Sequence, residues 1–188
     1  DVYKRQINGL DVSEEYEIKK TPFDNKKEIG EVSYLSKNKL EDIELDESWI
    51  GLDLEARIKI LNKVAVDIQN NRDKFFYLLA NEAGKTLKDC DAEVRESIDF
   101  INYYCHQAKE LFTKEELEGP TGEKNYLLHA PKGKFLCISP WNFPMAIFIG
   151  QISAALITGN SVIAKPAEDT SIIAYEIIKL FHEAGVPG

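Results

Sequence analysis

Two polar side chains, Asn142 and Lys165, each follow the end of a short apolar run that is typical of a β-strand. Pro140 and Pro144 flank Asn142 and restrict the backbone around it, so its side-chain amide is preorganised. Such an amide can donate a hydrogen bond to an oxygen that gains negative charge during a reaction. Glu168 follows Lys165, and together this cation and carboxylate suit the hydroxyls of a ribose. The sequence therefore predicts a ligand site around these residues.

Each of these residues also has a purely structural explanation. Asn142 could cap the helix that begins near Pro144, because its side-chain oxygen can accept from a free amide of the first turn. Lys165 could be a solvated lysine at a strand end. The glycine fingerprint GxGxxG of the common dinucleotide-binding loop follows neither strand. The residues by themselves therefore indicate a ligand-binding edge of an α/β sheet and go no further.

A strand–helix–strand unit is expected to position these side chains. Residues 135–138 form a continuous apolar run, which indicates a parallel strand that is covered on both faces. The helix over residues 145–157 is apolar nearly all round, has Pro144 at its first position and stops at Gly159. Residues 161–164 form the next strand. A right-handed crossover of this kind brings both turns to the carboxyl edge of the sheet, where ligands bind.

Amphipathic helices are predicted before and after this unit. Asp53 can cap a helix that begins at Leu54, a second helix stops at Gly84, Thr86 can cap a long third helix, and Thr170 can cap a last one. The apolar stripes of the first three recur at helical spacing. They are Leu54, Ile58, Leu61, Ala65 and Ile68, then Phe76, Leu79, Ala80 and Ala83, and then Leu87, Cys90, Val94, Ile98, Ile101, Cys105, Ala108 and Phe112.

The expected organisation has three parts. Residues 1–50 hold a strand or two and a polar connector, residues 51–125 form a helical segment, and residues 126–188 form the βαβα unit. Between the helices and the βαβα unit, residues 113–124 are predicted to be a surface loop and residues 126–130 a short strand. The fold class is therefore α/β.

The three cysteines are predicted to be structural. Cys90 and Cys105 lie on the apolar stripe of the third helix, and Cys137 lies within a buried strand. Their expected role is that of small buried hydrophobes and not of reactive thiols. Neither a disulfide framework nor a metal site is indicated by their spacing, which fits a reducing, cytoplasmic compartment.

Composition excludes several classes of partner. The chain has 188 residues and a formal net charge of -9, with no Lys/Arg cluster that would attract a nucleic acid. The opening segment DVYKRQINGL lacks the apolar region of a signal peptide. The most apolar run, residues 143–157, contains Gly150, Gln151 and Ser153 and is shorter than the ~20 residues that span a bilayer. No transmembrane segment is expected.

The motifs ISPWNFP (residues 138–144) and AKPAE (residues 164–168), followed by EAGVPG (residues 183–188), closely resemble the aldehyde dehydrogenase superfamily. The upstream stretch NEAGKTLKDCDAEVRESIDFINYYCHQA is similar to that of the glutamate-semialdehyde (1-pyrroline-5-carboxylate) dehydrogenases, including the dehydrogenase module of bifunctional proline-utilisation proteins. The resemblance implies N-terminal helices followed by the first part of a Rossmann-like, parallel-sheet NAD-binding domain, truncated at residue 188.

The resemblance also implies roles for individual residues. Asn142 would be the side-chain donor of the oxyanion hole, and Phe143 would lie near the aldehyde. The cofactor NAD would be bound by Ile138, Ser139, Pro140, Trp141, Lys165 and Glu168, the last two at its adenosine ribose. The carboxylate of Glu168 would favour NAD over NADP by repelling a phosphate, but the neighbouring Lys165 blurs that preference, so the choice between the two cofactors stays open. The family's nucleophilic cysteine and general-base glutamate lie downstream of EAGVPG, so this chain has the oxyanion donor without the nucleophile.

Three functional hypotheses follow. In the first, the chain is the N-terminal piece of an enzyme that oxidises the small-molecule aldehyde L-glutamate γ-semialdehyde to L-glutamate in proline catabolism. The piece alone is expected to be inactive. The parent enzyme is expected to be a homo-oligomer, and whether it is fused to a proline dehydrogenase module is left open. In the second, it is a non-catalytic nucleotide-binding or assembly fragment. In the third, the parent is an aldehyde dehydrogenase with a different substrate or acyl acceptor. An isolated chain is expected to aggregate, because the cut sheet has an unpaired edge.

Overall fold

The structure is a computed structural model that describes residues 2–3, 6–7, 10–11, 15–34 and 48–188. Most of the predicted polar connector lies outside the described residues. The helices of the described part are α1 (Leu54–Asn70), α2 (Arg72–Glu82), α3 (Leu87–Leu111), α4 (Ala146–Ile157), the short 3₁₀ turn η2 (Glu168–Thr170) and α5 (Ser171–Ala184). The strands are β1 (Val2–Tyr3), β2 (Gln6–Ile7), β3 (Leu10–Asp11), β4 (Glu15–Thr21), β5 (Asp24–Tyr34), β6 (Glu115–Leu117), β7 (Asn125–Leu127), β8 (Lys134–Ile138) and β9 (Ser161–Lys165).

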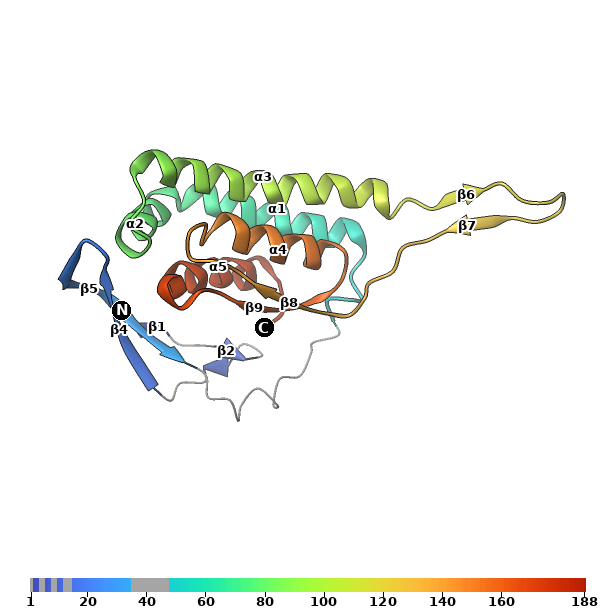
Figure 1. Ribbon diagram of the computed structural model, residues 1–188. Coiled ribbons are helices and arrows are strands. Elements are labelled where there is room, and N and C mark those ends of the chain that lie inside the picture. The colour runs from blue at the N-terminus through green and yellow to red at the C-terminus, as the bar shows by residue number, and fades with distance from the viewer. Residues whose placement is uncertain (1, 4–5, 8–9, 12–14, 35–47) are drawn as a thin grey trace.

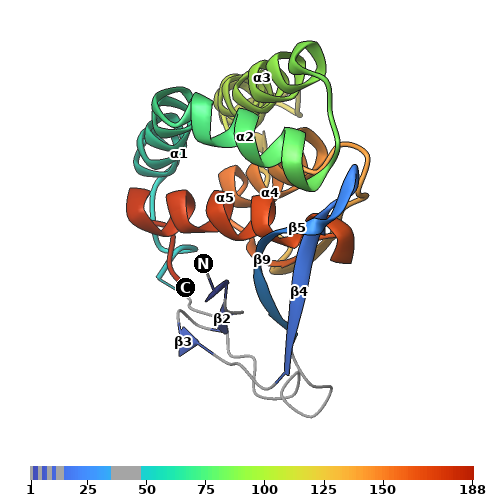
Figure 2. The same cartoon turned by 90° about the vertical axis from the view of Figure 1, so that its left-hand side faces the viewer.

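The predicted strand–helix–strand unit is β8–α4–β9, and its two strands pair in parallel. Figures 1 and 2 show α1, α2 and α3 as one layer over α4 and α5, with β8 and β9 on the far side of those two helices. A separate antiparallel pair, β4 and β5, packs near α2 and α5. The most buried side chains lie where the helical layer meets α4 and α5.

Local caps start the helices where the sequence predicts. The Asp53 carboxylate accepts from the Ala56 amide at 2.7 Å at the start of α1. The Thr86 hydroxyl accepts from the Asp89 amide at 3.3 Å and caps α3, as predicted, while it donates to the Asp89 carboxylate at 2.7 Å. This differs from a full capping box, in which the carboxylate would accept from the backbone amide of Thr86. Of the predicted stripe of α3, Cys90, Val94, Ile101, Cys105 and Ala108 are buried, Ile98 and Phe112 are partly buried, and Leu87 is 71% exposed. It lies in the first turn of α3, before the helix reaches its neighbours.

The predicted stripe of α2 is wrong by one residue. Phe75, Leu78 and Leu79 are buried, whereas Phe76 is only partly buried. The Arg72 guanidinium lies 4.8 Å from the centroid of the Phe76 ring and covers it at the surface. Both phenylalanines satisfy a helical period, so the contacts with other helices decide which one faces the core.

The segment predicted as a surface loop at residues 113–124 contains strand β6, which pairs antiparallel with β7. β7 is shorter than predicted and spans three residues. Figure 1 shows this hairpin projecting well beyond the helices. All six strand residues are exposed, so in the described structure the hairpin depends on its own backbone hydrogen bonds.

Strand β8 is not covered on both faces as its apolar run predicts. Cys137 is buried, but Phe135, Leu136 and Ile138 are 41%, 61% and 58% exposed. Within the described residues, α4 covers one face of the strand and β9 pairs with one of its edges. A strand that is apolar throughout is typical of a sheet covered on both faces. Here the second face and the second edge of β8 are not covered by any element that the structure describes.

The C-terminal end of α4 is tied to the helical layer. The Trp49 indole N–H donates to the carbonyl of Leu156 at 3.0 Å, and the Arg57 Nε–H donates to that of Ile157 at 3.1 Å. These bonds satisfy carbonyls that a helix end leaves unpaired. Gly159 ends the helix as predicted, with φ of +84°, a conformation that favours glycine.

The cysteines are buried and free, as predicted. Burial raises the pKa of the Cys105 thiol to about 11. It likewise raises the pKa of Cys90 and of Cys137 above the ordinary value. A thiol of this kind is a weak nucleophile at neutral pH, since the thiolate is the reactive form.

Candidate functional site

The carboxyl ends of β8 and β9 meet at one edge, as the sequence predicts. Ile138 pairs with Lys165 at the last rung of the two strands. Beyond it, the Ser139 amide donates to the Lys165 carbonyl at 3.1 Å. The turn that contains Asn142 and the turn that contains Glu168 therefore leave the sheet side by side.

Asn142 lies in the turn between β8 and α4 and is exposed. Its side chain makes no hydrogen bond to any residue that the structure describes. The structural alternative, in which it caps the following helix, is wrong. That helix begins at Ala146, with Met145 as its N-cap residue, so Pro144 precedes the first helical position and does not occupy it. The Asn142 amide is thus left available to a ligand.

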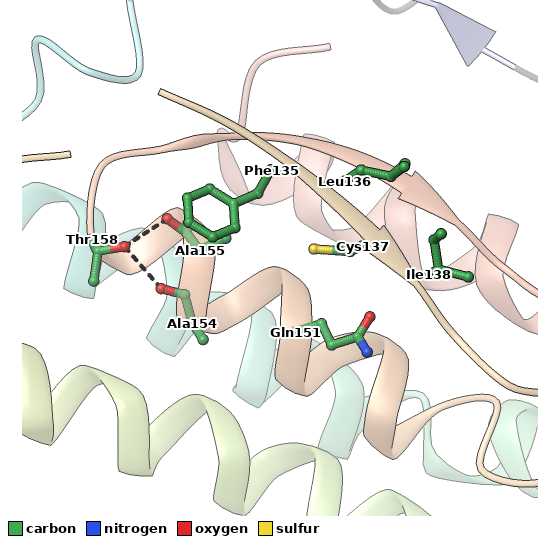
Figure 3. A pocket seen from close by; sticks show the side chains of 8 residues that line it. All are labelled: Phe135, Leu136, Cys137, Ile138, Gln151, Ala154, Ala155 and Thr158. Carbon is green, nitrogen blue, oxygen red and sulfur yellow. Dashed lines mark hydrogen bonds between the residues drawn. The ribbon is translucent and has the colours of Figure 1, made fainter. Parts of the chain in front are cut away.

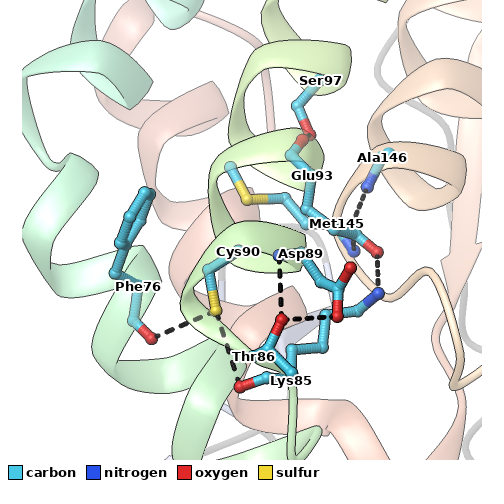
Figure 4. Close-up of polar contacts among 9 residues, drawn as sticks. All are labelled: Phe76, Lys85, Thr86, Asp89, Cys90, Glu93, Ser97, Met145 and Ala146. Atoms are coloured by element: carbon cyan, nitrogen blue, oxygen red, sulfur yellow. Dashed lines mark hydrogen bonds and ion pairs between the residues drawn. The ribbon is translucent and has the colours of Figure 1, made fainter.

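The cap of α4 comes from Glu93, a residue that sequence reasoning missed. One carboxylate oxygen of Glu93 accepts from the Ala146 amide at 2.8 Å and from the Met145 amide at 3.3 Å. The other oxygen lies 2.9 Å from the Lys85 ammonium. Figure 4 shows these groups converging between α3 and the start of α4. A signal was present in the sequence, because Glu93 falls on the buried stripe between Cys90 and Ser97.

Glu82 caps α5 in the same way, in place of the predicted Thr170. Its two carboxylate oxygens accept from the amides of Ile172 and Ile173 at 2.7 and 2.8 Å. Thr170 is the N-cap residue by position, but its side chain makes no capping hydrogen bond. Burial raises the pKa of Glu82 to about 7, and the two backbone hydrogen bonds oppose that rise. Helices α4 and α5 therefore both begin at a buried glutamate from the helical layer.

Lys165 and Glu168 form an ion pair at the sheet edge. The Lys165 ammonium lies 2.8 Å from a carboxylate oxygen of Glu168, and both side chains are substantially exposed. Close by, the Ser139 hydroxyl is buried and has no hydrogen-bond partner in the described part of the chain. The surface of this edge therefore offers a cation and a carboxylate within one short stretch, with the Ser139 hydroxyl buried beside the strand end. Such a set can bind a polyhydroxylated group such as a ribose.

An open apolar groove of about 480 Å³ runs along β8 and reaches its carboxyl end. Figure 3 shows it between the exposed side chains of β8 and one side of α4. Its lining comprises Phe135, Leu136, Cys137, Ile138, Gln151, Ala154, Ala155 and Thr158. Of the predicted site residues it includes Ile138, which pairs with Lys165, so the groove adjoins the polar edge at the last rung of the two strands.

A parallel βαβ unit with an unengaged Asn beyond its first strand and a Lys–Glu pair at the end of its second is an arrangement of the α/β class, in which ligands bind at the carboxyl edge of the sheet. The model of the aldehyde dehydrogenase family matches residues 10–188, and the chain belongs to that family. Within the described residues, no helix has the length and apolar character needed to cross a bilayer.

Proteins similar to this chain include proline-utilisation proteins and 1-pyrroline-5-carboxylate dehydrogenases. The bifunctional protein PutA of Salmonella typhimurium is 46% identical over 139 residues, which are 74% of this chain and 10% of that protein. The 1-pyrroline-5-carboxylate dehydrogenase 1 of Halalkalibacterium halodurans is 35% identical over 98% of this chain and 37% of its own length. A crystal structure of 1-pyrroline-5-carboxylate dehydrogenase from Thermus with bound NAD has a TM-score of 0.93 and 32% identity, covering 99% of this chain and 37% of that one.

The chain thus spans between about a tenth and somewhat over a third of the length of these relatives. Because the match covers only part of each relative, the activity and stability experiments below use a full-length protein, meaning one in which these 188 residues are joined to the remainder of an aldehyde dehydrogenase domain.

Glu82 predicts a pH dependence of stability. Its pKa is raised from the ordinary value of 4.5 to about 7 in the folded protein, so the folded state binds the proton more tightly than the unfolded state. The favourable contribution is therefore complete below pH 4.5 and is lost as the pH rises through about 7. We expect this carboxyl to cost on the order of 3 kcal/mol once it is ionised. Glu82→Gln, which stays neutral, should remove that loss.

The measurement is the thermal unfolding midpoint of the full-length protein and of Glu82→Gln across this pH range. Glutamine keeps only one of the two acceptors that cap α5, so the variant should be less stable than the parent at low pH. The midpoint of the parent should then fall toward that of the variant as the pH rises through about 7. Curves that stay parallel throughout would show that the carboxyl of Glu82 does not titrate in the range given by its burial.

Proposed function

We propose that this chain supplies the oxyanion donor and the adenosine-side cofactor contacts of an NAD-dependent aldehyde dehydrogenase that oxidises L-glutamate γ-semialdehyde to L-glutamate. The observation that carries the proposal is the unengaged side chain of Asn142 at the carboxyl edge, beside the Lys165–Glu168 pair. An open α/β sheet binds its ligands at that edge. Membership of the aldehyde dehydrogenase family supports the same assignment.

Asn142 acts on the oxygen of the aldehyde. Its amide N–H donates to that oxygen, and the hydrogen bond strengthens as the oxygen acquires negative charge on nucleophilic attack. Because the Asn142 side chain makes no capping hydrogen bond, no such bond has to break before its amide can donate to the substrate. Phe143, the next residue, places an apolar ring beside the same position and excludes water there.

The residues at the edge fit NAD. Lys165 donates to ribose hydroxyls and Glu168 accepts from them, while Ser139, whose hydroxyl is buried, belongs to the turn beside them. The backbone of Ile138, Pro140 and Trp141 lines the same turn. When bound, NAD accepts the hydride from the substrate carbon. The proximity of the Lys165 ammonium and the Glu168 carboxylate keeps this part of the surface close to neutral.

The nucleophile of this enzyme is supplied from outside these residues. Each of the three cysteines is buried, and burial raises the pKa of each thiol, so none is suited to form the thiolate that attacks an aldehyde. The 188-residue chain alone is therefore inactive under this proposal.

The substrate assignment rests on the relatives. Two of the similar proteins are called 1-pyrroline-5-carboxylate dehydrogenases, and a third is the bifunctional protein PutA. We infer the same aldehyde for this protein, and a proline dehydrogenase module in the same polypeptide as an alternative arrangement. Homo-oligomeric assembly and a cytoplasmic location remain predictions from the sequence.

The test follows reduction of NAD by the purified full-length protein with L-glutamate γ-semialdehyde and with pentanal, which has the same carbon chain but no amino acid head group. We expect kcat/KM to be about 10²-fold or more higher for the semialdehyde, since a site that binds polar groups rejects a ligand without them. A larger kcat/KM for pentanal would support an aldehyde dehydrogenase of another specificity. Turnover by the isolated 188-residue chain would contradict the external nucleophile.

A further inference from the structure

We propose that Lys85 and Glu93 form a positioning pair that holds the turn bearing Asn142 and Phe143 in its productive geometry. This inference rests on the proposed function of Asn142, but the contacts that carry it belong to the fold. It identifies two residues, about 50 positions before the motif in the sequence, as determinants of the same site.

Glu93 fixes the end of the turn. Its side chain is 1% exposed, and one oxygen binds the amides of Met145 and Ala146, where the turn becomes α4. These two amides belong to the group that a helix N-terminus leaves unpaired, and the positive end of the helix dipole favours a carboxylate there. The turn therefore has a fixed end only three residues after Asn142.

Lys85 acts on both Glu93 and Phe143. Its ammonium lies 2.9 Å from the second oxygen of Glu93 and 4.5 Å from the centroid of the Phe143 ring, and its side chain is 13% exposed. A cation over the face of an aromatic ring is attracted to it, more strongly when water is excluded. Gly84, with φ of +68°, lets the chain turn sharply after α2 and present Lys85 at this place.

The Lys85–Glu93 pair holds the turn around Asn142, whose own side chain has no described contact that would fix its position. Asn142 has no side-chain hydrogen bond of its own within the described structure, so its position follows from its neighbours in the turn. Phe143 is held by Lys85 on one side of it, and Met145 by Glu93 a little further on. The charge of Lys85 also neutralises Glu93, which would otherwise be a buried, uncompensated carboxylate. Loss of the pair should therefore displace the donor without removing it.

The first test compares Lys85→Met and Lys85→Arg in the full-length protein. Lys85→Met keeps an apolar stem against Phe143 but removes the charge, and we expect kcat to fall about 10- to 100-fold, because a small misplacement of a donor has effects of this size. KM for NAD should stay within about threefold of the parent value. Lys85→Arg restores a cation and should recover kcat to within about threefold.

A second set of variants separates positioning from folding. Lys85→Met leaves Glu93 buried and unpaired, whereas the double variant Lys85→Met/Glu93→Gln removes both charges, so its thermal midpoint should lie above that of Lys85→Met. Its kcat should nevertheless remain at least about tenfold below the parent, since the cation on Phe143 is gone. A double variant with parent kcat would overturn the proposal.

The coupling to Asn142 is tested by repeating Lys85→Met in an Asn142→Ala background. If the pair acts through Asn142, Lys85→Met should there change kcat by less than about threefold. An undiminished effect would contradict the inference. If Asn142→Ala itself leaves kcat unchanged, the proposed function of Asn142 has failed, and amide hydrogen exchange at Met145 and Ala146 still reports whether Lys85 and Glu93 hold the turn.

Lys109→Met is the matched control. Lys109 lies on α3 and also faces a glutamate, with its ammonium 3.6 Å from Glu55, but that pair is exposed and remote from the turn. Its removal should change kcat by less than about twofold, because an exposed ion pair contributes little. A loss of kcat equal to that of Lys85→Met would show that removing any lysine charge from the helical layer has the same effect, and would overturn a specific role for Lys85.

Discussion

Replacing Asn142 with alanine should lower the kcat of the full-length protein by about 10²- to 10³-fold, the range found when one oxyanion donor is removed. The effect is expected on kcat more than on KM, because the hydrogen bond strengthens only as charge develops on the substrate oxygen. The fold should be unaffected, since the cap of α4 comes from Glu93 and the Asn142 side chain is exposed. Steady-state NAD reduction measures the change.

Two further substitutions make this prediction specific. Asn142→Asp keeps the size of the side chain but replaces the donor with a carboxylate that repels the developing oxyanion, so its kcat should be at or below that of the alanine variant. Asn102→Ala, at an exposed position of α3, is the control and should be within about twofold of the parent. An Asn142→Ala protein with parent kcat would return Asn142 to a structural role.

Replacing Gly159 with alanine should destabilise the protein by about 2–5 kcal/mol, the sum of a left-handed backbone cost and an overpacking cost. Gly159 has φ of +84°, and a Cβ there would lie 2.9 Å from the Arg57 guanidinium and 2.9 Å from the Pro131 ring. Arg57 cannot move away freely because it donates to the Ile157 carbonyl at the end of α4. Urea titration of the full-length protein gives the free energy of unfolding.

Gly122→Ala provides the matched control. Gly122 also has a positive φ, of +96°, but a Cβ at that position would meet no atom within 4 Å. Its replacement should therefore show the backbone cost alone, about 1–2 kcal/mol or less. Equal losses for the two variants would mean that the contacts with Arg57 and Pro131 relax without cost, and would contradict the overpacking argument.

Most of the local structure could be predicted because its signals are local. Asp53 and Thr86 cap the helices that follow them, and Gly84, Gly159 and Gly185 end helices with positive φ. Each of these signals acts within about one turn of the chain, so a single sequence records it. The parallel pairing of β8 with β9 was also predictable, since a buried helix between two apolar runs leaves few other topologies.

The residues of the candidate site could likewise be predicted where their signal is local, and not where it depends on residues far away in the sequence. Asn142, Lys165 and Glu168 were found because they follow strand ends, and the structure places the two turns that carry them at one sheet edge. Whether Asn142 caps a helix was undecidable from its spacing. The answer depended on Glu93, whose carboxylate reaches the amides of α4 from a position 52–53 residues away.

The sequence by itself thus determined the class of fold, the order of its elements and the polar residues at the ligand-binding edge. The tertiary structure alone decided which side of α2 is buried, which face of β8 stays open, and that Glu82 and Glu93 start helices α5 and α4. The physical reason is the distance along the chain over which each interaction acts. Caps, glycines and apolar periods act between neighbours in the chain, whereas a buried carboxylate needs partners that only the packed layers bring to it, 90–91 residues away in the case of Glu82.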